Sequence, residues 1–209
     1  MQRRQSQNLL RAQIRLNQAA YWSFLIGSLA LLYAATKESH SKGFYEKLAA
    51  IPMIGGPIAC LPLKKWPHVH RLSSSLAIFS CTCLALRAIN SQSPDQALLH
   101  SQMAMIAINL YQILMPKDII SEKINKKLGV GRTQNICRTA IKAIDNPLAV
   151  GAIVKLMATI YTSSLSTTAH KDAIHLSAFI LFGIGYLCQS ISKQPNIKWG
   201  KRQIEPVLN

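Results

Sequence analysis

Three polar side chains are the strongest candidates for chemistry, because each lies in a long apolar stretch. Lys155 is the only charge in segment 146–165, NPLAVGAIVKLMATIYTSSL. A lysine inside hydrocarbon is rare and is by default a candidate for binding a ligand or partner. His100 and His175 lie near the ends of two other apolar stretches, and paired histidines on facing helices can hold haem or a metal. We take Lys155, His100 and His175 as candidate contacts for a ligand or partner.

The other residues that could carry chemistry argue against an enzyme. Neither histidine has an acid or a cysteine at a metal-ligand spacing, so we expect interfacial polar residues there, with no metal and no cofactor. The sequence has no GxSxG or HExxH motif and no glycine-rich phosphate loop. All eight acids lie outside the apolar stretches or at their edges, which leaves little for carboxylate or metal catalysis. We therefore predict no catalytic residues.

Lys155 can be placed along its own predicted helix. Asn146 and Pro147 suit the N-cap and the first helical position, so the lysine lies about 12 Å into the helix at 1.5 Å per residue. No apolar stretch offers a carboxylate to neutralise it. Three fates remain open: the side chain snorkels to the membrane surface, a partner or anionic ligand holds it, or burial leaves it neutral.

A membrane bundle is the architecture that would position these side chains. Only 15% of the residues are charged, against about 25% in typical soluble domains. Six apolar stretches approach the length that crosses a bilayer core of about 30 Å. The sequence therefore predicts an all-α, multi-pass membrane bundle with about six transmembrane helices, and a soluble all-α domain is the alternative. The stretches are 19–35, 48–63, 72–89, 97–115, 147–165 and 173–192.

The second stretch, 48–63, is the weakest of the six. It is interrupted by Pro52, Gly55, Gly56, Pro57 and Pro62, and proline inside a helix removes a hydrogen bond and kinks the chain. We expect a kinked span here, with a re-entrant segment as the alternative.

The charges between the stretches alternate, as the positive-inside rule requires. One set of connections carries net charges of +4, +3, +4 and +3: residues 1–18, 64–71, 117–145 and 193–209. The other set carries +1, 0 and 0: residues 37–47, 87–96 and 170–172. A soluble bundle has no reason to alternate in this way. The pattern predicts basic tails at 1–18 and 193–209 that both lie on the cytosolic side, or on the equivalent matrix or stromal side.

The net charge of +16 does not indicate a nucleic-acid partner, because the basic residues are spread between apolar stretches and do not gather in one patch. The longest connection, 117–145, is predicted to form two basic amphipathic helices, which suit an anionic membrane surface, with a solvated linker as the alternative. We therefore expect anionic lipid headgroups as partners. The residues predicted to contact them are Lys126, Lys127, Arg138 and Lys142.

Two functions fit this architecture. The lack of acids inside the membrane favours a non-enzymatic assembly or scaffold subunit, which would hold protein partners or organise an anionic membrane. The alternative is a small transporter or channel, in which Lys155 would line the path of an anion or polar solute together with Asn109, Gln112 and Tyr161.

Overall fold

The computed structural model describes residues 2–38, 40–54, 67–91, 93–114 and 147–192, and the secondary structure in these ranges is all helical. This confirms the predicted all-α class. The helices are α1 (Gln2–Lys37), α2 (His40–Met53), α3 (Pro67–Ile89), α4 (Gln96–Leu114), α7 (Pro147–Leu165) and α8 (Ala173–Ser192).

Local sequence explains where four of these helices begin. Pro67 and Pro147 occupy the first positions of α3 and α7, where a missing N–H leaves no hydrogen bond unmade. Asp95 caps α4 by accepting a hydrogen bond from the Leu98 amide at 2.9 Å. Asp172 caps α8 in the same way, because its Oδ1 accepts a hydrogen bond from the His175 amide at 2.8 Å.

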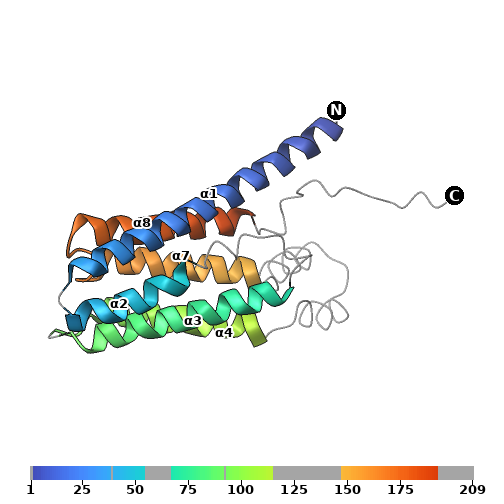
Figure 1. The fold of residues 1–209 in the computed structure, drawn as a ribbon. Coiled ribbons are helices and arrows are strands. Elements are labelled where there is room, and N and C mark those ends of the chain that lie inside the picture. Colours follow the sequence, from blue (N-terminus) through green and yellow to red (C-terminus); the bar gives the residue numbers. More distant parts are fainter. Residues whose placement is uncertain (1, 39, 55–66, 92, 115–146, 193–209) are drawn as a thin grey trace.

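The six helices form a closed ring in which each packs against two neighbours (Figure 1). The pairs are α1 with α2, α2 with α3, α3 with α4, α4 with α7, α7 with α8, and α8 with α1. Helices α1, α3 and α7 run in one direction, and α2, α4 and α8 run in the other. The α1–α2, α3–α4 and α7–α8 connections therefore lie at one end of the ring, called the turn end below. The opposite end, where α1 projects beyond the other helices, is called the terminal end.

The contact between α1 and α8 depends on two glycines that accept two phenylalanine rings. Phe24 of α1 lies over Gly185 of α8, where an added Cβ would come within 2.6 Å of the ring. Phe182 of α8 lies over Gly27 of α1, where a Cβ would come within 3.0 Å of the ring. Each glycine thus provides the space for a ring of the other helix, and this lets the two backbones approach closely.

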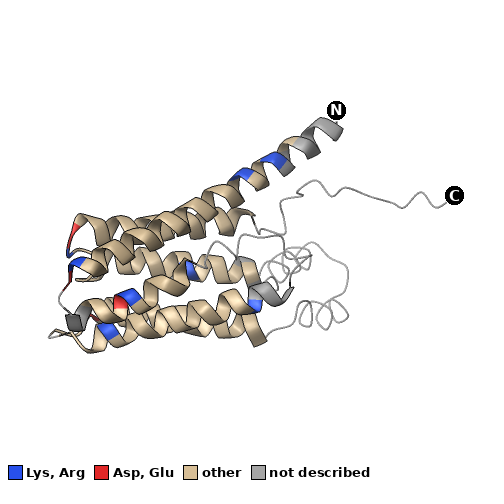
Figure 2. Ribbon diagram, in the orientation of Figure 1, with Lys and Arg blue, Asp and Glu red and all other residues tan. Residues whose placement is uncertain are grey.

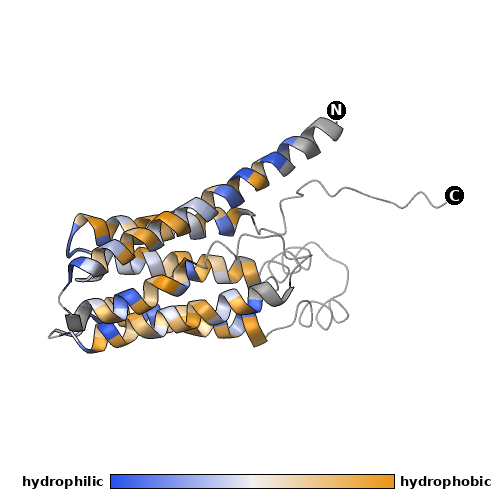
Figure 3. Ribbon diagram, viewed as in Figure 1, coloured by the Kyte–Doolittle hydropathy of each residue, from blue (hydrophilic) through white to orange (hydrophobic). Residues whose placement is uncertain are grey.

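The interior of the bundle mixes apolar clusters with buried polar side chains, whereas large apolar side chains are exposed outside. Figure 3 shows the helices coloured by hydropathy. Many of the bundle's largest fully buried side chains are polar: Glu46, Gln102, Asn109, Thr159, Thr162 and His175. Large apolar side chains are exposed on the outer face of every helix, among them Leu29, Ile51, Phe79, Leu110, Met157 and Ile184. Water-soluble bundles have the opposite distribution.

Four of the helices are long and apolar enough to cross a membrane, by length and composition: Arg11–Lys37, Arg71–Ile89, Gln96–Leu114 and Ala173–Ser192. A shorter apolar segment, Val150–Leu165, lies in α7. Of the six expected spans, four therefore correspond to helices in the described residues that are long and apolar enough to cross a membrane. The predicted tail 1–18 is, apart from its first residue, the first half of α1.

The helix at the second apolar stretch begins and ends earlier in the chain than the expected span 48–63. Helix α2 begins at His40, eight residues before the stretch, and ends at Met53. Its 14 residues correspond to about 21 Å at 1.5 Å per residue, less than a bilayer core. Residues 55–66 lie outside the described residues, as does the predicted basic connection 117–145.

Candidate functional site

A cavity of about 100 Å³ lies at the centre of the ring and is lined by side chains from all six helices. This volume is several times what one water molecule needs. Its walls combine apolar rings, such as Phe24, Phe179 and Phe182, with polar groups. The polar lining includes Ser73, Ser80, Gln102, Asn109, Gln112, Lys155, Thr159 and Gln189.

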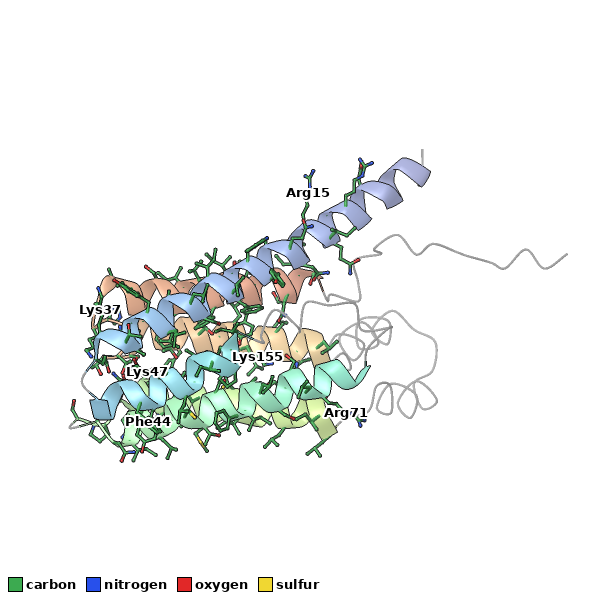
Figure 4. The ribbon with its side chains drawn as sticks, viewed as in Figure 1. Arg15, Lys37, Phe44, Lys47, Arg71 and Lys155 are labelled. Atoms are coloured by element: carbon green, nitrogen blue, oxygen red, sulfur yellow. The ribbon has the colours of Figure 1, made fainter. Side chains whose placement is uncertain are left out.

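Lys155 is the cation in this cavity. Its side chain points from α7 into the ring (Figure 4), and its Nζ donates a hydrogen bond to Gln112 Oε1 of α4 at 2.9 Å. Gln112 lies two residues before the end of α4, so the amine leans toward the terminal end, as a helical side chain that points toward its own N-terminus should. None of the described carboxylates forms an ion pair with it.

The backbone of α7 allows this pair to form. A Cβ on Gly151, one turn before Lys155, would collide with the carboxamide of Gln112. Only a residue without a side chain leaves room for Gln112 to lie over α7 and meet the lysine. Gly151 is therefore a positioning residue for the Lys155–Gln112 contact.

Two buried amide oxygens beside the cavity have no hydrogen-bond donor among the described residues: Gln102 Oε1 and Asn109 Oδ1. The orientation of Asn109 is fixed because its Nδ2 donates to the Met105 carbonyl at 2.7 Å. A buried acceptor without a donor costs about 1 to 3 kcal/mol. The cavity therefore presents one cationic donor and unmet acceptors at the same time.

A second polar centre lies near the turn end, where Figure 2 shows acidic and basic residues on neighbouring helices. Arg87 of α3 forms ion pairs with Glu46 of α2 and with Glu38, the residue that follows α1. The distance from Arg87 Nη2 to Glu38 Oε1 is 3.4 Å. Arg87 Nη1 donates to Thr168 Oγ1 at 2.9 Å. Lys171 also pairs with Glu38. One guanidinium thus joins α1, α2, α3 and the α7–α8 connection.

His175 belongs to this charged cluster and is fully buried. Its Nε2 lies 3.1 Å from Glu46 Oε2, and its Nδ1 lies 3.0 Å from Asp172 Oδ1, close but not aligned as a hydrogen bond. The Asp172 carboxyl accepts hydrogen bonds from the His175 and Ile174 amides. The first of these bonds is the main reason that the pKa of Asp172 is lowered from its usual value.

The acids of this cluster could in principle reach a metal ion together with His175. Ligand atoms of Glu38, Glu46 and His175 lie within 4.8 Å of one another. Arg87 already contacts both carboxylates, and Lys171 contacts one of them. A divalent ion would have to displace these cations, so we interpret the group as an ion-pair cluster.

Asp95 joins the α3–α4 turn to the α7–α8 turn beside this cluster. Besides capping α4, its carboxyl accepts hydrogen bonds from Ser166 Oγ at 2.7 Å, Thr167 Oγ1 at 3.1 Å and the Thr168 amide at 2.9 Å. Burial opposes ionisation of this carboxyl, but these hydrogen bonds and the one from Leu98 outweigh it and lower its pKa.

The three candidate contacts predicted from sequence lie in three different places. Lys155 lines the central cavity, His175 lies in the charged cluster, and His100 is exposed on α4. The two histidines do not lie together, because His175 faces Glu46 and His100 is exposed on α4. The predicted headgroup contacts Lys126, Lys127, Arg138 and Lys142 lie outside the described residues.

Sequence reasoning missed Arg87, Glu46 and Asp95 as site residues. Arg87 and Asp95 were treated there only as opposite charges that cancel within connection 87–96. Glu46 was treated only as one of the charges of connection 37–47. Arg87 could have been identified from the sequence, because it is the only charged residue in the apolar stretch 72–89. A buried arginine is stable only when an acid pairs with it. Comparisons with protein-family models, curated proteins and solved structures found no match.

Proposed function

We propose that the protein is a multi-pass membrane protein whose helix ring binds a small oxyanion at Lys155 and carries it across the bilayer. The observation that supports this most is the position of Lys155: it lines a cavity with mixed apolar and polar walls formed by all six helices, and no described carboxylate pairs with it. A cation held in the low-dielectric interior of a bundle attracts an anion more strongly than the same cation would in bulk water.

The distribution of polarity supports the membrane part of the proposal. Lipid would cover the exposed apolar side chains, and four helices have the length and composition to cross a membrane. The connections at the turn end carry little net charge, so by the positive-inside rule the opposite, terminal end would face the cytosol or its equivalent. Cysteines introduced at Ser93 and Lys126 should react with impermeant reagents from opposite sides of the membrane. Reaction of both from one side would refute this topology.

The lining also suggests what the solute looks like. Lys155 would donate to an anionic oxygen, whereas Gln102 and Asn109 would accept hydrogen bonds from an O–H or N–H of the same molecule. Phosphate has both kinds of group at neutral pH, and sulfate has nearly the same shape but no O–H. The proposal therefore predicts that phosphate is preferred over sulfate.

Flux into proteoliposomes tests this function. Vesicles that contain the full-length protein should take up radiolabelled phosphate faster than protein-free vesicles, and excess unlabelled sulfate should compete poorly. Lys155→Met should abolish the uptake because it removes the cation and keeps most of the volume. Lys37→Met is the matched control, since Lys37 is exposed at the turn end and contacts only the Tyr33 ring among the described residues.

Folding of both variants is checked by gel filtration and circular dichroism. Wild-type vesicles that take up no phosphate, sulfate or chloride above the protein-free rate would rule out the transport proposal. Equal loss of uptake in Lys155→Met and Lys37→Met would rule out the role of Lys155.

A second candidate is the assembly or scaffold subunit predicted from sequence. The observation in its favour is the first half of α1, which projects beyond the bundle and exposes Arg11, Arg15 and Ile14. Such a basic, partly apolar arm suits a protein partner or an anionic membrane surface. Gentle detergent extraction should then yield a stoichiometric complex that is lost when residues 2–15 are removed. Isolation as a lone monomer would contradict this candidate.

A further inference from the structure

The charged cluster at the turn end has no part in the proposed anion site. His175, Glu46 and Arg87 do not line the central cavity. Four of the cluster's charged side chains, those of Glu38, Glu46, Arg87 and His175, are buried. Burying charges costs free energy unless each is paired, and a structural helix contact could be made by apolar residues instead. Ionisable groups inside membrane bundles commonly hold and move protons.

The surroundings of His175 determine its protonation. A neutral imidazole has one N–H and one lone pair, whereas an imidazolium has two N–H groups. Both ring nitrogens of His175 lie within 3.1 Å of a carboxylate oxygen, Nε2 beside Glu46 and Nδ1 beside Asp172. A neutral ring would turn its lone pair toward one of these anions. The imidazolium is attracted to both.

The net charge of the cluster also favours the protonated form of His175. The charged groups that face one another here come from every neighbouring element: Glu38 after α1, Glu46 of α2, Arg87 of α3, and Lys171 and Asp172 before α8. Asp95, before α4, approaches only through Thr168. With His175 protonated, three acids and three bases of the cluster balance. With His175 neutral, one buried negative charge is left over.

We propose that His175, held between Glu46 and Asp172, is a proton-binding site that opens to the turn end of the bundle. Protons would enter at Asp172, whose side chain is 43% exposed, whereas His175 and Glu46 are fully buried. The proton held on Nε2 can pass to Glu46 Oε2, which leaves a neutral carboxylic acid and an imidazole that still holds its Nδ1 proton toward Asp172. Return of this proton through His175 and Asp172 to water at the turn end leaves the cluster with one net negative charge.

Nuclear magnetic resonance of the full-length protein in micelles tests this site directly. With ¹⁵N-labelled histidine, each ring is assigned by single His→Gln variants. His175 should show two protonated ring nitrogens at pH 7.5, and His100, which is exposed on α4, serves as the reference ring in the same spectrum. In Glu46→Gln, His175 should become neutral at the same pH. If that variant does not fold, Asp172→Asn at the exposed rim should shift the titration of His175 in the same direction.

A neutral His175 in the wild-type protein at pH 7.5 would overturn the proposal. An unchanged His175 titration in the folded Glu46→Gln or Asp172→Asn variant would overturn it as well. Because the readout is the protonation of one ring, it does not depend on phosphate transport. Failure of the anion proposal and failure of the proton site can therefore be told apart.

Discussion

Asp95 offers the sharpest test of how the turn end is held together. Asparagine caps helices about as well as aspartate does, so Asp95→Asn should keep the cap on α4 and change only the contacts to the α7–α8 turn. The Ser166 and Thr167 hydroxyls can rotate and accept from the new amide group. The Thr168 amide is a fixed donor, however, and would face an N–H₂ group.

The expected loss follows from these contacts. One buried backbone N–H without an acceptor costs about 1 to 3 kcal/mol, and the loss of charge on the acceptor weakens the remaining hydrogen bonds by about 1 kcal/mol. We expect Asp95→Asn to lower the free energy of unfolding by about 2 to 4 kcal/mol at pH 7. Asp95→Ala removes the cap as well and should lower it by about 1 kcal/mol more. Unfolding is followed by tryptophan fluorescence in mixed micelles titrated with dodecyl sulfate.

The pH dependence adds an independent check on the same residue. Because its hydrogen bonds lower the pKa of Asp95 in the folded protein, its contribution to stability is present above the unfolded value of about 4. It is lost as the pH falls through the lower folded pKa. The stability difference between wild type and Asp95→Asn should therefore narrow below about pH 4. A difference under 0.5 kcal/mol at pH 7 (roughly the effect of an ordinary surface substitution) would refute the structural role of Asp95.

Other predictions address the ion pairs, the close helix contact and the lysine site. Arg87→Met should destabilise the protein by about 3 to 5 kcal/mol, because it leaves two buried carboxylates without their guanidinium; a thermal midpoint equal to wild type would contradict this. Gly185→Ala should cost about 1 to 3 kcal/mol through collision with the Phe24 ring, whereas Gly183→Ala meets only an ordinary contact at 3.7 Å and should be nearly neutral in the same assay. Gly151→Ala should displace the glutamine from the lysine and reduce phosphate uptake while the protein remains folded, and unchanged uptake would argue against that positioning role.

The sequence predicts the helices well because apolar length and capping residues are local signals. The apolar stretches 147–165 and 173–192 coincide with α7 and α8, and Asp172 and Pro147 mark where these helices begin. Helix α2 was harder to place, because its first half is polar and contains Glu46, which local patterns assign to a connection. The burial of Glu46 in α2 is explained by its ion pair with Arg87 of α3, which lies far away in the sequence.

The site could be predicted only in part, because periodicity says which residues share a helix face but not which helix lies opposite. Lys155 was identified as an unusual residue from its own stretch. Its partner Gln112 lies 43 residues earlier in the chain, and Glu46, the partner of His175, lies 129 residues earlier. Such pairs depend on closure of the ring, which no local pattern encodes.

The central claim is that Lys155 binds an oxyanion inside the helix ring. Arsenate has the shape and the O–H groups of phosphate, and its arsenic atom can be located by anomalous X-ray scattering. Crystals of the full-length protein grown with arsenate should show an arsenic peak in the cavity, with an arsenate oxygen within hydrogen-bond reach of Lys155 Nζ. Crystals of Lys155→Met should lack it. An empty cavity in the wild-type protein, or the same peak in both proteins, would contradict the account.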